Sequence, residues 1–445
     1  MRKYINREIE SGVLKRMDAG FIVAILGARQ VGKTTLLHRI REILLSQGIP
    51  PSHIFFFSFD DPILRAQVSS NFHFIKNYME DALGKELKEE KETIYLFLDE
   101  AQKVPVLFEL VKIFYDTYKG KLRIIISGSA SLQIQKKVVE TLAGRVSYLY
   151  LFPFSIKEII QEKTGMSLGK SLWEDWEGVN LKTLQERQSY LFRYRDSLEI
   201  LLRKIILEGT MPPIFTRESK EEKNLAMQSF VSTYLDKDIR SLGDIGELDN
   251  FSNLLRLLAF EIGGVVNLSS ISRDLGISIN TLKKYLSVMR NTFVINPLSS
   301  YSGRERKKIV KAKKLYFFDV GVANYLARRE YFEHLSGANV LGVVFENILL
   351  KSFESFNKNR PFPYDIYFFR DYQGHEVDFL IESSSGLVGV EVTYHEHITQ
   401  EKKKVFECFF RNFPGAKAMI VYRGRVNEVN IKGNKVLCVP WWLWW

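Results

Sequence analysis

The stretch FIVAILGARQVGKTTLLHRI, residues 21–40, decides the fold of the amino-terminal part of this chain. Its first six residues are apolar and predict a buried strand. The loop Gly27-Ala28-Arg29-Gln30-Val31-Gly32-Lys33-Thr34 follows, and apolar residues then recur at helical spacing. The spacing Gly-x-x-x-x-Gly-Lys-Thr between a strand and a helix is the P-loop signature, which predicts a site for the phosphates of a nucleotide.

Each residue type in this loop has a physical reason to be there. Glycines allow backbone angles that turn successive amides toward phosphate oxygens, and the positive end of the following helix faces the same anion. Lys33 is expected to hold the β and γ phosphates, and the Thr34 hydroxyl to ligate Mg²⁺. The residues expected to bind ATP are Gly27, Ala28, Arg29, Gln30, Val31, Gly32, Lys33, Thr34 and Thr35.

A second apolar run, TIYLFLDEAQ, ends in the acidic pair Asp99-Glu100. Beside a P-loop, Asp99 is expected to support the Mg²⁺ and Glu100 to orient and deprotonate the attacking water, which makes the chain an ATP hydrolase. Taken alone, the pair would be better explained as ordinary solvated acids at the end of a strand; it is the P-loop that favours the catalytic interpretation.

The runs FIVAIL, HIFFFSFD, TIYLFLDE and LRIIISGS predict strands buried on both faces, separated by segments long enough for crossover helices. This pattern predicts an α/β fold, a doubly wound parallel sheet, for residues 1–155. Helical spacing dominates residues 156–260, a predicted helical lid or connector, in which Met211-Pro212-Pro213 marks a turn.

Several segments together resemble the AAA-type P-loop ATPases of prokaryotes, especially archaea, that carry a nuclease-like carboxy-terminal domain. The segments are GARQVGKTTLL, LFLDEAQ, IIISGSAS, LAGRVSYLYLFPFSIKE, YLDKDI, FENILL and GHEVDFLIE. In such ATPases a polar residue at the end of the strand that corresponds to LRIIISGS senses the γ-phosphate. Ser127 or Ser129 fits, and Ser129 is favoured, although a strand-end turn is the alternative. Arg145 is a candidate charge-stabilising finger, in cis or from a neighbouring subunit of a homo-oligomer, or else a surface arginine.

Residues 261–320 predict a winged helix-turn-helix. Ser269 to Leu275 form its first helix, Gly276 its turn, and Ser278 caps a second helix. The second helix offers Asn280, Thr281, Lys283 and Lys284, and the basic connection of the following hairpin offers Arg304, Arg306, Lys307, Lys308, Lys311, Lys313 and Lys314. This arrangement predicts double-stranded DNA as a partner, with packing or oligomerisation as the alternative.

Residues 321–445 predict a restriction-endonuclease-like α/β domain. Glu346 on a helix, with Asp378 and Glu391 on neighbouring strands, resembles a PD-(D/E)XK nuclease core that binds Mg²⁺. Thr393 stands where that pattern has lysine, and Lys402 or Lys403 could replace it. A degenerate, binding-only domain is the alternative. We assign none of His375, His395 and His397 as a ligand.

Composition sets broad limits. The net charge of +11 and pI near 9.3 favour a polyanionic partner or a lysine-rich solvated surface. Cys408 and Cys438 are the only cysteines, which excludes a four-cysteine zinc cluster and indicates a reducing cytoplasm. No apolar run reaches the length needed to span a membrane, and the first residues are not expected to act as a secretory signal. The tail VPWWLWW is expected to pack on the last strand, with a partner-binding patch as the alternative.

The sequence therefore predicts Mg²⁺-dependent ATP hydrolysis coupled to DNA binding. Two alternatives stay open: a nucleotide-switched signalling or scaffold ATPase with a protein partner, and an ATP-dependent nuclease.

Overall fold

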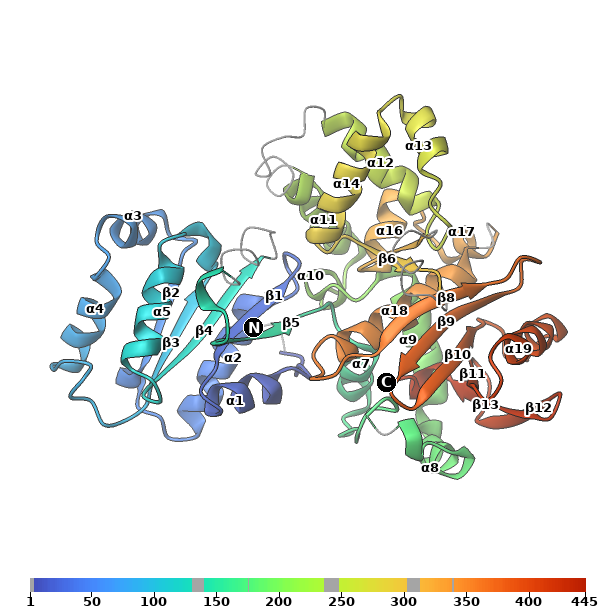
Figure 1. Cartoon of the computed structure of the whole chain (residues 1–445), viewed down its shortest axis with the longest axis horizontal. Helices are drawn as coiled ribbons and strands as arrows, with labels where there is room; N and C mark the ends of the chain where they lie inside the picture. The colour runs from blue at the N-terminus through green and yellow to red at the C-terminus, as the bar shows by residue number, and fades with distance from the viewer. Residues whose placement is uncertain (1–3, 130–139, 175, 236–247, 302–312, 338–339) are drawn as a thin grey trace. The chain divides into compact units, whose positions relative to one another are not determined.

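The computed structural model describes residues 4–129, 140–174, 176–235, 248–301, 313–337 and 340–445. The chain divides into two compact units. Residues 6–152 and 291–293 form the first, here the phosphate-loop unit, and residues 1–5, 153–290 and 294–445 form the second, the carboxy-terminal unit. Figure 1 shows the element labels used below. Among the described residues, no helix combines the length and apolarity needed to cross a bilayer.

The phosphate-loop unit is a five-stranded parallel sheet of order β2-β3-β4-β1-β5 with helices between its strands (Figure 1). Its elements are α1 (Glu10–Asp18), β1 (Ile22–Gly27), α2 (Lys33–Ser46), η1 (Pro51–His53), β2 (Ile54–Ser58), α3 (Pro62–Ser70), α4 (Phe74–Leu83), β3 (Ile94–Asp99), η2 (Ala101–Lys103), α5 (Leu107–Thr117), β4 (Leu122–Ser129) and β5 (Val146–Tyr150). The predicted parallel α/β fold is confirmed, and the edge strand β5 is an addition to the four strands that the sequence predicts.

Side chains alternate along these strands, so one face of the sheet is purely apolar at its centre and the other face also carries polar residues. One face, with Leu96, Leu98, Ile124 and Ile126, packs in a cluster with α4 and α5. Neighbouring residues of a strand point to opposite faces, so Asp99 and Ser127 lie on the other one, which contacts α2. Because β4 lies between β1 and β3, its end is flanked by the loop after β1 and by the end of β3.

The carboxy-terminal unit begins with helices and a hairpin. These elements are α7 (Ile156–Thr164), η3 (Trp176–Gly178), α8 (Leu181–Leu191), η4 (Phe192–Tyr194), α9 (Arg195–Glu208), α10 (Pro212–Phe215), α11 (Lys220–Thr233), α12 (Leu248–Phe260), α13 (Leu268–Leu275), α14 (Ile279–Asn291), β6 (Ile295–Ser299), β7 (Lys313–Phe317), α16 (Val320–Leu326) and α17 (Phe332–Gly337). Gly276 has φ +66° between α13 and α14, and the Ser278 hydroxyl accepts a hydrogen bond from the Thr281 amide at 3.0 Å. Helix, turn, helix and antiparallel hairpin thus follow in the predicted order.

A six-stranded mixed sheet of order β12-β13-β11-β10-β9-β8 completes this unit. Its elements are α18 (Leu341–Asn357), β8 (Asp365–Arg370), β9 (Glu376–Ser383), β10 (Gly386–Val392), α19 (Gln400–Asn412), β11 (Lys417–Tyr422), β12 (Asn427–Ile431), β13 (Asn434–Pro440) and η7 (Trp441–Leu443). Strand β11 is parallel to both β10 and β13, whereas β8, β9 and β10 form antiparallel pairs. The hairpin β6–β7 joins this sheet through a bridge from Ser300 to Phe368.

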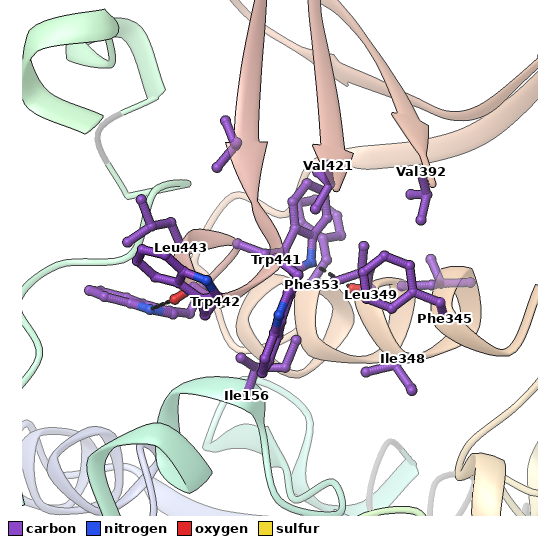
Figure 2. Close-up of a cluster of buried hydrophobic side chains, with 14 of the residues drawn as sticks. Ile156, Phe345, Ile348, Leu349, Phe353, Val392, Val421, Trp441, Trp442 and Leu443 are labelled. Carbon is purple, nitrogen blue, oxygen red and sulfur yellow. Dashed lines mark hydrogen bonds between the residues drawn. The ribbon is translucent and has the colours of Figure 1, made fainter. Parts of the chain in front are cut away.

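The tryptophan-rich tail is buried in the core of this unit. Trp441, Trp442 and Trp444 are at most 1% exposed. Figure 2 shows Trp441, Trp442 and Leu443 beside the apolar side chains of α18. The Trp444 indole donates to the Leu349 carbonyl at 2.7 Å, so the tail packs against a helix as well as following the last strand.

We expect Trp444→Phe to destabilise the carboxy-terminal unit by about 1–3 kcal/mol, because it removes a buried hydrogen bond and leaves part of the indole volume empty. Denaturant unfolding followed by tryptophan fluorescence measures this unit alone, since all six tryptophans lie within it. Tyr190→Phe is the control, as that ring is 68% exposed. A shift no larger than that of the control would contradict the packing role.

Candidate functional site

The loop between β1 and α2 has the backbone that a phosphate site requires. Only glycine fits at position 27, where a Cβ would come within 2.3 Å of the Leu151 carbonyl oxygen. Gly32 has φ +96° and Gln30 has φ +61°, so the chain takes left-handed turns that aim successive amides to one side. The nine residues expected to bind ATP form this loop and the first turn of α2.

Lys33 and the loop carbonyls are held from within the same unit. The Lys33 ammonium donates to the carbonyls of Ala28 at 2.9 Å and Gly27 at 3.2 Å. Arg7 donates to the Val31 carbonyl at 2.9 Å and to the Phe152 carbonyl at 2.5 Å. A buried arginine thus ties the P-loop to the segment after β5, and sequence reasoning missed it because nothing in the P-loop signature points to residue 7.

Thr34, Asp99 and Ser127 form a chain of hydrogen bonds at the carboxyl ends of the strands. The Thr34 hydroxyl donates to Asp99 Oδ2 at 2.8 Å, and the Ser127 hydroxyl donates to Asp99 Oδ1. Asp99 and Ser127 are fully buried. The hydroxyl and carboxylate oxygens are hard donors of the kind that Mg²⁺ prefers, so the residues present fit this ion.

Glu100 has an unusual backbone. Its φ of +53° places it in the left-handed region, where residues other than glycine, asparagine and aspartate are rare. The Gln102 amide donates to Glu100 Oε2 at 2.6 Å, a contact that the sequence did not predict. Such strained residues gather at functional sites, so the conformation is consistent with a directed carboxylate.

The structure brings Ser129 toward the site but not Arg145. Ser129 pairs in register with Gly27, at the level where the P-loop begins, and its side chain lies outside the described part of the chain. Arg145 precedes β5, whose first residue pairs with Ile22 at the amino edge of the parallel sheet, about 17 Å from the P-loop edge at 3.3 Å per residue. There it forms a two-pronged contact with Asp116, at 2.8 and 3.0 Å. Its placement removes the finger role in cis, and a role toward a neighbouring subunit stays a prediction.

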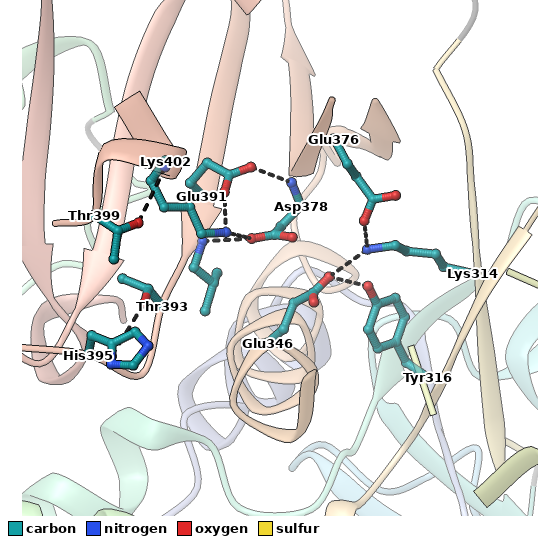
Figure 3. A network of polar contacts seen from close by, with 11 residues as sticks. Lys314, Tyr316, Glu346, Glu376, Asp378, Glu391, Thr393, His395, Thr399 and Lys402 are labelled. Carbon is teal, nitrogen blue, oxygen red and sulfur yellow. Dashed lines mark hydrogen bonds and ion pairs between the residues drawn. The ribbon is translucent and has the colours of Figure 1, made fainter. Parts of the chain in front are cut away.

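A second polar cluster lies in the carboxy-terminal unit (Figure 3). The Lys402 ammonium, on α19, contacts Glu391 and lies 3.3 Å from Asp378 Oδ2. The Asp378 amide donates to Glu391 Oε1 at 3.2 Å, and the Val392 amide donates to Asp378 Oδ2 at 2.8 Å. Of the two lysines that the sequence offered, Lys402 therefore meets both carboxylates.

Glu346, on α18, is held by the hairpin β6–β7 rather than by this pair. Glu346 Oε1 accepts from the Tyr316 hydroxyl and lies 3.3 Å from the Lys314 ammonium, which also contacts Glu376 (Figure 3). Lys314 is 5% exposed, so the prediction that it contacts DNA phosphate is wrong. Burial and then the charge of Asp378 raise the pKa of Glu346, which places the two carboxylates in one electrostatic site.

The charges of this cluster do not balance. Four carboxylates face two ammonium groups; the residues are Glu346, Glu376, Asp378, Glu391, Lys314 and Lys402. Burial and the charge of Asp378 raise the pKa of Glu391. Burial alone would lower the pKa of Lys402, but Asp378 and Glu391 raise it. The remaining negative charge would be offset by protonation of Glu346 and Glu391, whose pKa values are raised, or by a divalent cation. Thr393 lies outside the network, because its hydroxyl accepts from the His395 amide at 3.3 Å.

The exposed side of α14 is polar and basic. Its buried residues are Leu282, Tyr285, Val288 and Met289, whereas Asn280, Lys283, Lys284 and Arg290 are exposed. The predicted phosphate-binding residues Arg304, Arg306, Lys307, Lys308 and Lys311 lie outside the described residues. Of the predicted wing residues, Lys313 is described and is half-buried at the start of β7, so among the described residues the helices carry most of the exposed basic surface of this module.

Three family models match the chain. Residues 20–160 match an AAA domain, residues 199–333 a domain of unknown function (DUF8612) and residues 341–443 another domain of unknown function (DUF4143). The AAA domain match covers nearly all of the phosphate-loop unit and supports an AAA-type P-loop ATPase there. The predicted winged helix and nuclease-like domain fall in the two segments whose families have no described function.

Curated relatives align over most of the chain. An uncharacterized protein of Mycobacterium tuberculosis is 22% identical over 87% of this chain and 73% of its own length. An uncharacterized protein of Haemophilus influenzae is 22% identical over 96% of this chain and 95% of its own length. An uncharacterized protein of Methanocaldococcus jannaschii is 23% identical over 99% of this chain and 91% of its own length.

Solved structures are more distant. The Walker-type ATPase PABY2304 of Pyrococcus abyssi has a TM-score of 0.40 and 16% identity, and covers 73% of this chain and 96% of its own. AMPPCP-bound DnaA of Aquifex aeolicus has a TM-score of 0.26 and 18% identity, and covers 64% and 87%. These scores are too low to decide the fold or function of this chain.

Proposed function

We propose that the phosphate-loop unit binds and hydrolyses ATP with Mg²⁺, and that the carboxy-terminal unit couples this cycle to double-stranded DNA. The observation that carries the first part is the chain from Thr34 through Asp99 to Ser127 beside a P-loop with left-handed turns. It is supported by the AAA domain match over residues 20–160.

Each residue has a task in this proposal. Lys33 exchanges its bonds to the Gly27 and Ala28 carbonyls for the β and γ phosphates, and the loop amides hold the phosphate oxygens. Thr34 and Asp99 would hold Mg²⁺, which supplies neutralisation of phosphate charge when bound. Glu100 accepts the proton of the attacking water, and Ser129 senses the γ-phosphate.

The test of the nucleotide site is Lys33→Ala. We expect its affinity for a fluorescent ATP analogue with Mg²⁺ to fall about 10- to 100-fold, because a charge-assisted hydrogen bond contributes about 1.5–3 kcal/mol. Lys112→Ala, an exposed lysine on α5, is the matched control and should bind as the wild type does. Equal affinity in the two variants would overturn the proposed phosphate site.

The coupling to DNA rests on the exposed basic residues of α14. We expect the wild type to bind duplex DNA with an affinity that falls with salt, and Lys283→Ala/Lys284→Ala to lower the slope of log K against log salt by about two, one for each phosphate contact. The double variant Lys112→Ala/Lys119→Ala removes the same charge elsewhere. Binding without salt dependence, together with an ATP turnover indifferent to DNA, would remove this part of the proposal.

A second candidate function is metal-dependent cleavage of DNA by the carboxy-terminal unit. The cluster of Asp378, Glu391 and Lys402 favours it, because two carboxylates can bind a metal while an ammonium stabilises the charged phosphorus. Lys402, on α19, would supply the ammonium that the nuclease pattern expects at position 393, where this chain has threonine.

A further inference from the structure

A third group of side chains lies where the β8–β9 hairpin meets α19, elements drawn in orange to red in Figure 1. Asp371 and His375 flank the hairpin turn, and Cys408 lies on α19. One ligand atom from each of these three residues lies within 4.8 Å of the others. Within the described part of the chain, this is the one such trio of histidine, cysteine and carboxylate ligands.

The carboxylate is fixed before any ligand arrives. Asp371 Oδ1 accepts from the backbone amides of Gln373 at 2.9 Å and His375 at 2.8 Å. The other oxygen, Oδ2, lies 2.9 Å from His375 Nδ1 and 3.0 Å from Cys408 Sγ. One oxygen of the carboxylate is thus used to hold its orientation, and the other points to an imidazole nitrogen and a sulfur.

The two elements that carry these residues share one apolar core. Val377 of β9 packs in a cluster with Phe406, Phe409 and Phe410 of α19, which are on both sides of Cys408 along the helix. Gly374, with φ +89°, closes the turn and brings His375 back beside Asp371. The packing of α19 on β9 and the turn at Gly374 therefore fix the backbone positions from which the three ligands extend.

We propose that Asp371 Oδ2, His375 Nδ1 and Cys408 Sγ bind a Zn²⁺-type transition cation, with a fourth position open to water. One oxygen, one nitrogen and one sulfur suit Zn²⁺ or Co²⁺ rather than Mg²⁺, which prefers oxygen. Ligand distances of about 2.0–2.3 Å separate tetrahedral ligands by about 3.3–3.7 Å, so the present contacts need to lengthen by about half an ångström. The side chain of His375 is 36% exposed, which gives the metal a way in.

Binding releases the protons now shared in this trio. The His375 ring must present an unprotonated Nδ1, with its proton on Nε2, and Cys408 must lose its proton to water. A bound metal would tie α19 to the hairpin next to the strand that carries Asp378, independently of ATP.

Cobalt substitution tests the site. The full chain without a polyhistidine tag, kept reduced and free of nucleotide, is titrated with Co²⁺. We expect one equivalent to produce the near-ultraviolet band of a cobalt–thiolate bond, and Zn²⁺ to remove it. The oxygen-rich P-loop and the cluster around Asp378 can bind Co²⁺ as well, but they contain no sulfur and cannot produce this band.

The chain supplies its own matched control, because Cys408 and Cys438 are its only cysteines and both are buried. The band should persist in Cys438→Ser, vanish in Cys408→Ser, and need at least about tenfold more Co²⁺ in His375→Gln. Tryptophan fluorescence establishes that each variant is folded. The absence of a band in the wild type, or an unchanged titration in folded His375→Gln, would overturn the proposal.

Discussion

Glu100→Gln should abolish most of the ATP turnover while ATP binding remains. A general base contributes about 10²- to 10⁴-fold, and glutamine keeps the size and the hydrogen-bonding reach of the side chain while it cannot accept a proton. The left-handed backbone of Glu100 and the contact from Gln102 indicate a carboxylate held in one direction. We therefore expect kcat to fall by two to four powers of ten, with the affinity for the ATP analogue within a few-fold of wild type.

The measurement is steady-state phosphate release, with and without duplex DNA. Glu109→Gln is the matched control, since Glu109 is an exposed acid in the first turn of α5. A Glu100→Gln enzyme that turns over within a few-fold of the control would show that Glu100 is not the base. Asp99 would not inherit that role, because both of its oxygens already accept hydrogen bonds.

The proposed nucleotide site could be predicted from the sequence because its parts are local. The P-loop is a single continuous segment, and parallel strands place their carboxyl ends at one edge, which brings Asp99 to Thr34. Strand β5 was missed because four of its five residues are only half-buried, as expected at the edge of a sheet, and it lacks a continuous apolar run. Arg145 was expected near the site because it follows the other site segments along the chain. Its position in the sequence does not show that it lies at the amino edge of the sheet, where β5 begins.

The second cluster was predicted in part, for a similar reason. Strand and helix patterns located Glu346, Asp378 and Glu391, but the choice between Lys402 and Lys403 depends on where α19 begins, which Thr399 sets by capping it. Lys314 looked like part of a basic surface. Residues 314 and 316 of a strand share a face, and here that face meets α18, which an analysis of charge alone does not consider.

The trio of Asp371, His375 and Cys408 could not be seen in the sequence. Asp371 and His375 are close in the chain, but a hairpin turn makes an Asp and a His common neighbours without any ligand. Cys408 joins them only through the packing of α19 on the sheet, which involves phenylalanines far from the turn. A site made by tertiary packing leaves no spacing pattern for a sequence motif to match.

Lys402→Met is expected to have the largest effect on the stability of the carboxy-terminal unit. Its ammonium contacts Glu391, which is fully buried, and Asp378. Removing one partner of a buried ion pair costs about 3–5 kcal/mol, because the other charge stays in a poor solvent. The Lys402 side chain is 24% exposed, so we expect the lower end, about 3 kcal/mol, in EDTA. Denaturant unfolding followed by tryptophan fluorescence measures it.

The same variant separates metal binding from cleavage. If Asp378 and Glu391 bind a divalent cation, Mn²⁺ should restore most of the stability that Lys402→Met loses, because the cation neutralises the carboxylates in place of the missing ammonium. Mn²⁺ should also bind Lys402→Met more tightly than it binds the wild type. Cleavage of plasmid DNA with Mn²⁺, if the wild type shows it, should fall about 10²- to 10³-fold, because the metal does not replace the ammonium at the reacting phosphate. Lys404→Met, exposed on the same helix, should change neither quantity.

The outcomes assign the cluster to one of three roles. Mn²⁺ stabilisation with cleavage that depends on Lys402 makes the carboxy-terminal unit a nuclease driven by an ATPase. Mn²⁺ stabilisation without cleavage makes it a metal-binding module, in which Lys402 and the cation compete for the same carboxylates. A Lys402→Met protein that is destabilised and indifferent to Mn²⁺ leaves the network as a support between α19 and the sheet. In that case the hairpin residues Lys314 and Tyr316 hold Glu346 for packing rather than for chemistry.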